Sequence, residues 1–183
     1  SHPMRLDRLT NATREALMAA QQTAAQAGHP ELKAEHMLVA LLAQPDGVSQ
    51  ALIRKAGADP KPIAEDFART LGALPSVKGG AEPALSRGLR SLFTQAWAET
   101  EGLQDEYTSA EHVLLAAYKY GQLKKALSAQ GVDRAKLLQA VQEVRGSQRV
   151  TDPDPEGKFQ ALEKYTRDLT EAARQGKTDP VID

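Results

Sequence analysis

The sequence contains two copies of one unit, displaced from each other by 76 residues (34 to 110). The pentapeptide Ala-Glu-His-Met-Leu at 34–38 returns as Ala-Glu-His-Val-Leu at 110–114. Further matches are Leu9-Thr10 with Leu85-Ser86, Leu17 with Phe93 and, after a contraction of two residues, Lys55–Asp59 with Ala129–Asp133. Because both copies repeat the same apolar, cap and turn positions, we expect two copies of one helical unit.

Each copy is predicted to form four helices, so the expected fold class is all-α. Thr10 is the expected N-cap of the first helix, and Gly28 ends it. Asp59 followed by Pro60 is the typical start of another helix. Aromatic residues make up only 4% of the chain, which also favours helices over strands. In copy one the helices are expected over 10–27, through 37–42, over 48–57 and from 59 through 71; in copy two they are expected over 86–101, 108–120, 122–130 and 133–145.

Loop-forming residues divide the chain into segments. Residues 1–3 precede Met4 and are interpreted as the remnant of an expression tag. A double-repeat domain is predicted over 4–146, with repeat one at 4–74 and repeat two at 83–146. Two Asp-Pro steps then predict a flexible linker over 147–157. A helical segment is expected over 158–183, with Phe159, Leu162, Tyr165 and Leu169 along one stripe.

Composition excludes several classes of function. The chain has no cysteine, which removes disulfides and thiolate zinc sites and suits a cytoplasmic, reducing compartment. A net charge of -1 argues against nucleic acid or an anionic membrane as a partner. No apolar run approaches the roughly 20 residues that a membrane-spanning helix needs.

The triplet Gly176-Lys177-Thr178 matches the end of a phosphate-binding loop. That loop needs a glycine five residues before the second one, where this chain has Glu171. The preceding residues form a helical stripe instead of a buried strand, and Asp179-Pro180 follows where a helix should begin. We therefore expect no nucleotide site, no bound cofactor and no enzymatic activity in this chain.

The Glu-His pairs, Glu35-His36 and Glu111-His112, suggest a metal site or acid–base chemistry. Without cysteine or two histidines on one helical face, no metal site is predicted. Thr108–Glu111 fits a capping box, with the carboxylate reaching back to the N-cap amide, whereas Leu32 occupies the cap position in copy one. The histidines are interpreted as structural groups that find hydrogen bonds near a helix start.

Apolar residues of the first helix in each copy have two interpretations. Most are expected to be core, but a two-copy arrangement can leave some along a seam between the copies, where they would form a binding groove. The residues concerned are Leu9, Leu17, Leu85, Leu89 and Phe93.

The opening Met4–Thr10, the two Glu-His helix starts, and the closing 162–170 and 176–182 resemble the N-terminal part of the ClpB family of Clp/Hsp100 bacterial disaggregases. In that family this stretch joins the N-terminal domain to the first AAA+ ATPase module, which needs ATP and Mg. The chain is thus expected to stop before that module, since it has no Walker motif.

The resemblance implies a mobile domain that binds unfolded or aggregated polypeptides for a homohexameric motor that works with a DnaK-type chaperone system. The isolated chain is expected to be a monomer. Residues tied to chaperone activity in the family match Thr10, Asp105 and Glu111. We expect Asp105 and Glu111 at the rim of an apolar seam, where they favour substrates with basic residues.

An alternative keeps the fold and changes the ligand. The related ClpC and ClpA families have similar Glu-His helix starts and dock adaptors. In that case Glu35 and Glu111 would form two equivalent sites for cationic or phosphoarginine groups. The tail pattern Lys164-Tyr165-Thr166 favours ClpB.

Overall fold

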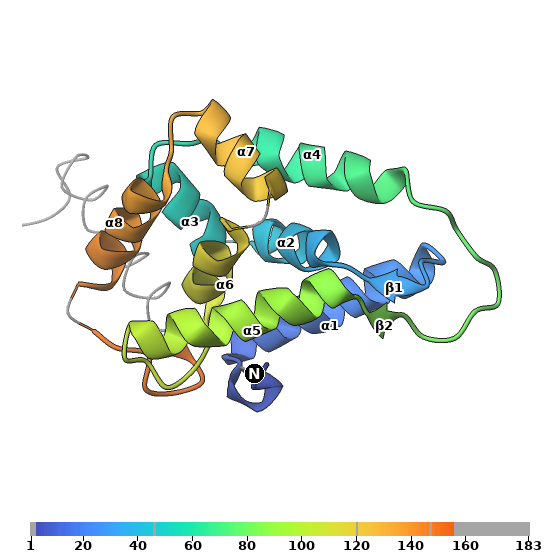
Figure 1. The fold of residues 1–183 in the computed structure, drawn as a ribbon, viewed down its shortest axis with the longest axis horizontal. Helices are drawn as coiled ribbons and strands as arrows, with labels where there is room; N and C mark the ends of the chain where they lie inside the picture. The colour runs from blue at the N-terminus through green and yellow to red at the C-terminus, as the bar shows by residue number, and fades with distance from the viewer. Residues whose placement is uncertain (1–2, 46, 120, 147, 156–183) are drawn as a thin grey trace, which may run out of the picture.

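The computed structural model describes residues 3–45, 47–119, 121–146 and 148–155, and within them it confirms the all-α class (Figure 1). The predicted helical segment over 158–183 lies outside the described residues, as do residues 1 and 2. The helices are α1 (Asn11–Gln26), α2 (Ala34–Ala43), α3 (Val48–Lys55), α4 (Pro60–Gly72), α5 (Arg87–Gly102), α6 (Ala110–Ala117), α7 (Gly121–Ala129) and α8 (Arg134–Arg145). A short 3-10 helix, η1 (Leu6–Arg8), precedes α1.

Side-chain caps fix where most of these helices begin. The Thr10 hydroxyl accepts from the Thr13 amide at 3.3 Å, and its counterpart Ser86 accepts from the Leu89 amide at 3.1 Å. Asp59 and Asp133 cap α4 and α8 in the same way, through the amides of the second and third helical residues. Gly28 follows α1 with a φ of 74°, a conformation that favours glycine. These four starts and this stop confirm the predictions.

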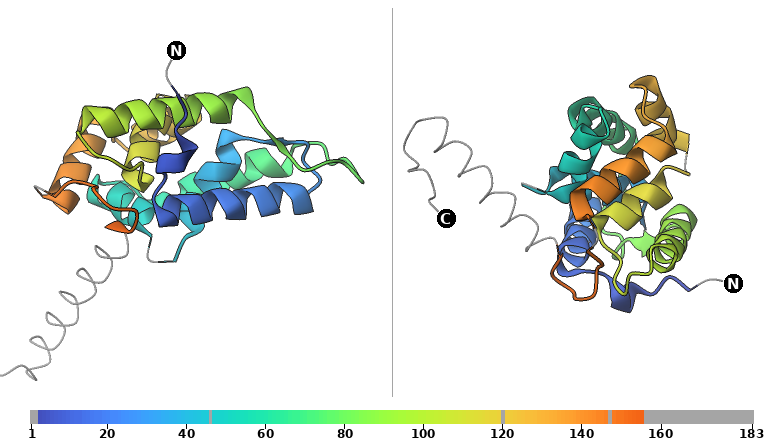
Figure 2. Two further views of the ribbon diagram at one scale, coloured as in Figure 1. Left: turned by 90° about the horizontal axis from the view of Figure 1, so that it is seen from below. Right: turned by 90° about the vertical axis from the view of Figure 1, so that its left-hand side faces the viewer.

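Both copies contribute to one hydrophobic core. Within the copies α1 packs on α2 and α5 on α6, while α2 meets α5 and α3 meets α6 and α8 across the copies. Leu41 and Ile53 of copy one lie in the same buried cluster as Leu89 and Leu115 of copy two. The first helices, α1 and α5, lie on different sides of this core (Figure 2).

Two short strand pairings, absent from the predictions, join the copies. β1 (Glu31–Leu32) runs parallel to β2 (Ala84–Leu85), and Leu9 forms a bridge with Thr108. The two pairings are related by the repeat: the Ser86 amide donates to the Leu32 carbonyl at 2.9 Å, and the Thr10 amide donates to the Thr108 carbonyl at 2.9 Å. Each copy therefore holds the start of the other copy's first helix.

The chain after α8 turns back onto the domain. The Pro153 carbonyl accepts from the Asn11 amide at 2.7 Å, and the Val150 carbonyl accepts from the Glu106 amide at 2.8 Å. Val150 is buried, with 4% of its surface exposed. Within the linker predicted over 147–157, residues 148–155 thus lie against the domain in this conformation, because Val150 and the backbone of this segment find partners there; the flexibility of the linker stays a prediction.

Candidate functional site

Three of the five residues proposed for an apolar seam lie in the core instead. Leu9, Leu89 and Phe93 are at most 2% exposed and belong to the core cluster. Leu17 and Leu85 are half-buried and pack against that cluster. The groove interpretation fails for the first three residues because α1 and α5 lie apart, so their apolar faces meet other helices of the core.

The Glu-His helix starts are built around the histidine. His36 Nδ1 accepts from the Lys33 amide at 2.9 Å, and His112 Nδ1 accepts from the Ser109 amide at 2.9 Å. Each imidazole at the third helical position thus performs the reciprocal half of a capping box, a role usually taken by Glu or Gln. The structural interpretation of both histidines is confirmed.

The cap positions of these two helices differ from the prediction by one residue. The predicted box over Thr108–Glu111 is wrong, since Ser109 is the N-cap of α6 and His112 is its third residue. In copy one the N-cap is Lys33 instead of Leu32, which belongs to β1. The strand pairings cause this shift, because they hold Leu32 and Thr108 in extended backbone before each helix.

Each of these histidines has a buried partner, and the partner differs between the copies. In copy one His36 Nε2 lies 2.8 Å from His29 Nδ1. In copy two His112 Nε2 lies 2.6 Å from Asp105 Oδ2. His29 and Asp105 are themselves related by the displacement of 76 residues (29 to 105). The pKa of His36 is lowered to about 4, first by burial and then by the charges of His29 and Lys33.

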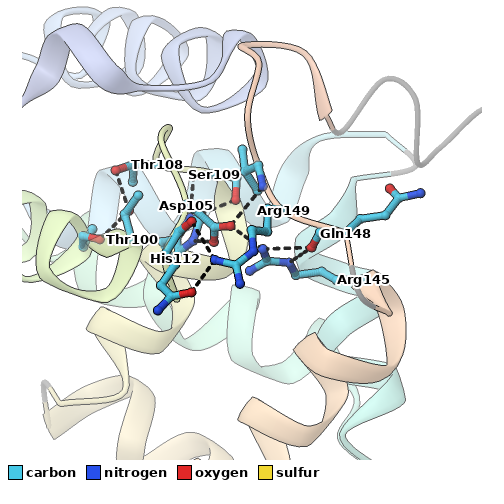
Figure 3. A network of polar contacts seen from close by, with 11 residues as sticks. Thr100, Asp105, Thr108, Ser109, His112, Arg145, Gln148 and Arg149 are labelled. Carbon is cyan, nitrogen blue, oxygen red and sulfur yellow. Dashed lines mark hydrogen bonds and ion pairs between the residues drawn. The ribbon is translucent and has the colours of Figure 1, made fainter. Parts of the chain in front are cut away.

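Asp105 joins three parts of the domain (Figure 3). Oδ2 accepts from the His112 ring on α6, while Oδ1 accepts from the Arg145 guanidinium at the end of α8 and from the Val150 amide at 2.9 Å. Burial alone would raise the pKa of Asp105, but these hydrogen bonds outweigh burial and hold the pKa at about 2. Its side chain is fully buried, so the expectation that it lines a rim is wrong.

Thr10 is equally inaccessible. Its side chain is 0% exposed and lies 2.8 Å from the Thr13 hydroxyl, in addition to capping α1. A direct contact between Thr10 and a ligand is therefore inconsistent with this conformation. Any effect of the residue on binding has to pass through the start of α1.

Glu111 differs from the other predicted residues. It is 6% exposed, and its carboxylate makes no hydrogen bond or ion pair with any residue in the described part of the chain. Glu35, its repeat counterpart, is half-buried on α2. The two glutamates predicted as equivalent thus lie in different surroundings.

Glu111 lines a pocket of about 70 Å³ between α3 and α8, here called the α3–α8 pocket. Its apolar walls are Val48 and Leu52 of α3 and Val141 and Val144 of α8. The remaining lining residues are Arg145, Gln148, Arg149, Val150 and Pro155. Glu111 is a largely buried residue whose carboxylate has no partner among the described residues, and it lines the pocket together with aliphatic side chains. Such a carboxylate can accept a hydrogen bond from a ligand whose apolar part enters the pocket.

Sequence reasoning missed the valines of this pocket, although the repeat contains a signal for one of them. In this part of the chain the displacement is 74 residues (67 to 141), so Val141 corresponds to Phe67 of α4. Phe67 is fully buried in the core. The replacement of a large by a small apolar residue in the second copy leaves room at the corresponding place.

No three His, Cys, Asp or Glu side chains within the described ranges are grouped so as to hold a metal ion. None of the helices there is both long and apolar enough to cross a membrane.

Comparison with known proteins identifies the family to which this fold belongs. The Clp repeat (R) N-terminal domain family matches residues 8–130. The chain belongs to this family. It is 44% identical over 177 residues to the chaperone protein ClpB of Corynebacterium glutamicum, covering 94% of this chain and 21% of that protein. This Clp N-terminal domain therefore spans about a fifth of the length of its ClpB relative, and the predicted resemblance to the ClpB family is confirmed.

Solved structures show the same fold. The Hsp104 N-terminal domain from Candida albicans superimposes with a TM-score of 0.70 at 22% identity, covering 81% of this chain and 98% of that one. A complex of the ClpV N-domain with a VipB peptide superimposes with a TM-score of 0.61 at 22% identity, covering 74% and 86% of the two chains.

Proposed function

We propose that this Clp N-terminal domain binds exposed apolar segments of unfolded or aggregated polypeptides and presents them to an ATP-driven disaggregase. The α3–α8 pocket with Glu111 is the observation that carries this proposal. Aliphatic walls suit an apolar side chain, and the carboxylate suits a neighbouring lysine or arginine. In this proposal the chain itself only binds polypeptide. ATP, Mg and the catalytic step belong to the AAA+ part of a cytoplasmic, hexameric parent protein, and DnaK-type chaperones act together with that parent.

The solved complex of a ClpV N-domain with a VipB peptide supports a peptide ligand, since that domain has the same fold. Affinity is expected to be weak, because a pocket of about 70 Å³ holds little apolar area. Weak binding suits a domain that has to release its ligand to a motor.

A titration with unfolded casein tests the proposal. We expect NMR amide shifts at Val48, Leu52 and Val141 that saturate with casein concentration. Glu111→Gln removes the charge and keeps the shape, so affinity should fall by about tenfold, the equivalent of one charged hydrogen bond. Shifts that avoid α3 and α8, or an unchanged affinity, would exclude the pocket as the binding site.

Glu35→Gln is the matched control and also tests the alternative. The alternative, docking of adaptor or phosphoarginine groups at Glu35 and Glu111, requires both substitutions to weaken binding of free phosphoarginine. Because Glu111 is buried beside a pocket while Glu35 is half-buried on α2, we expect only Glu111→Gln to affect casein. Equal losses for the two variants with phosphoarginine would favour the alternative.

A further inference from the structure

Residues 148–155, here called the strap, are held on the domain mainly by hydrogen bonds. Backbone groups of the strap bond with Asp105, Glu106 and Asn11. At its exposed start, Arg145 donates to the Gln148 carbonyl and Arg149 donates to Gln104. Within the strap, Val150 alone has a buried side chain. A segment that buries so little apolar surface, and whose hydrogen bonds lie largely near solvent, is one of the easier parts of a domain to release.

Asp105 is the residue that makes this attachment possible. Its two carboxylate oxygens accept from His112 on one side and from Arg145 and Val150 on the other. His29, at the same place in copy one, meets His36 through one ring nitrogen. An imidazole at position 105 would satisfy His112 but would leave Arg145 and the Val150 amide without an acceptor. The carboxylate in copy two is thus matched to the presence of the strap.

The strap also forms one wall of the α3–α8 pocket. Val150 and Pro155 line it together with Val48 and Val141. The pocket volume of about 70 Å³ is roughly half that of an enclosed apolar cavity of about 150 Å³ that binds benzene. Full entry of a large apolar side chain is therefore favoured by movement of a wall, and the strap is the wall that is not a helix and has a single buried side chain.

We infer that the strap is a releasable lid on the α3–α8 pocket and that Asp105 is its anchor. Entry of a large apolar side chain then favours the released strap, and release in turn favours entry, because coupling between two equilibria is reciprocal. Binding of a ligand in the pocket would thereby change how the chain after residue 155 is attached to the domain. The claim that a ligand side chain enters the pocket rests on the proposed function. The claim that Asp105 holds the strap on the domain does not.

Amide hydrogen exchange at Val150, followed by NMR, tests the anchor directly. Asp105→Ala should accelerate this exchange by about tenfold to a hundredfold, the effect of losing a hydrogen bond to a charged group, while amides of α2 keep their protection. Val150→Ser is the second variant, because it weakens the strap without touching the buried cluster. Asp154→Ala, an exposed substitution within the strap, is the control and should leave exchange unchanged.

Binding of α-casein tests the lid. Val150→Ser should bind casein several-fold more tightly than Asp154→Ala, and saturating casein should accelerate Val150 exchange in the wild-type chain. Unchanged Val150 exchange in folded Asp105→Ala would overturn the role of Asp105 as anchor. Should that variant not fold, the same result in folded Asp105→Asn, which turns one acceptor oxygen into a donor, would overturn it. Equal casein affinity of Val150→Ser and wild type would overturn the lid. If no variant binds casein at all, the proposed function and the lid both fall, and the exchange result still decides the anchor.

Discussion

The buried His29–His36 pair predicts that copy one loses stability in mild acid. The His36 ring is 2% exposed, and its Nδ1 accepts from Lys33 while Nε2 faces His29. A proton on Nδ1 would break the first contact. Burial first, and then the charges of His29 and Lys33, lower the pKa of His36 from 6.5 to about 4 in the folded state. Between these two values the unfolded chain binds a proton that the folded chain does not.

The sign and size of the effect follow from this difference. Because the folded pKa lies below the unfolded one, the free energy of unfolding falls as the pH drops from 6.5 towards 4 and levels off below that. Each pH unit is worth about 1.4 kcal/mol for one proton, so the loss at pH 5 is about 2 kcal/mol. For a domain of this size such a loss lowers Tm by several degrees.

Urea unfolding at pH 7, 6 and 5 measures this contribution when wild type is compared with His36→Gln. The glutamine can still accept from the Lys33 amide at the third helical position, so the cap survives while the titrating ring is lost. The variant should be less stable at pH 7 but show a shallower fall towards pH 5. Identical slopes for the two proteins would refute the assignment of the acid sensitivity to His36.

Three further predictions concern Asp105, the helix caps and the core. Hydrogen bonds outweigh burial and hold the pKa of Asp105 at about 2, below the ordinary value of 3.8, so its stabilisation is present above 3.8 and is lost as the pH falls through 2. Asp105→Asn should thus cost about 2 kcal/mol in urea unfolding at pH 7 and less than about 0.5 kcal/mol at pH 2. Thr10→Ala and Ser86→Ala remove corresponding caps and should each lower the free energy of unfolding by about 0.5 to 2 kcal/mol. The loss should be larger for Thr10, which also contacts the Thr13 hydroxyl, and a smaller loss for Thr10 than for Ser86 would contradict this. Leu89→Ala should lower the free energy of unfolding by about 2 to 5 kcal/mol in the same assay, because Leu89 is fully buried. Leu17→Ala should lower it clearly less, because Leu17 is half-buried. Equal losses would contradict the assignment of Leu89 to the core and of Leu17 to its edge.

The elements that the sequence predicts well are those specified by neighbouring residues. Thr10, Ser86, Asp59 and Asp133 each cap a helix within a few positions of their own, and so their helices begin where expected. The strand pairing of Leu32 with Leu85 is two residues long and joins distant segments, so no local pattern announces it.

The burial of Asp105 was equally hidden from the sequence. Its cluster draws on His112, on Arg145 at the far end of α8 and on the Val150 amide. The proline-rich composition that predicted a flexible linker reports only the backbone's inability to form a helix. It contains no information on whether Val150 finds an apolar site to fill.

The positions at which the two copies differ are informative about function. If both copies had the same surroundings, such differences would be scattered along the chain without any pattern. The change from His29 to Asp105 supplies the second carboxylate oxygen that binds Arg145 and Val150, and the change from Phe67 to Val141 leaves room in the α3–α8 pocket. Both changes lie in copy two and adjoin residues 148–155. A core that needed only to be filled would gain nothing from the smaller valine, since lost packing costs stability. In copy two the smaller apolar residue therefore lies where the domain meets residues 148–155, beside the pocket that we propose as the ligand site.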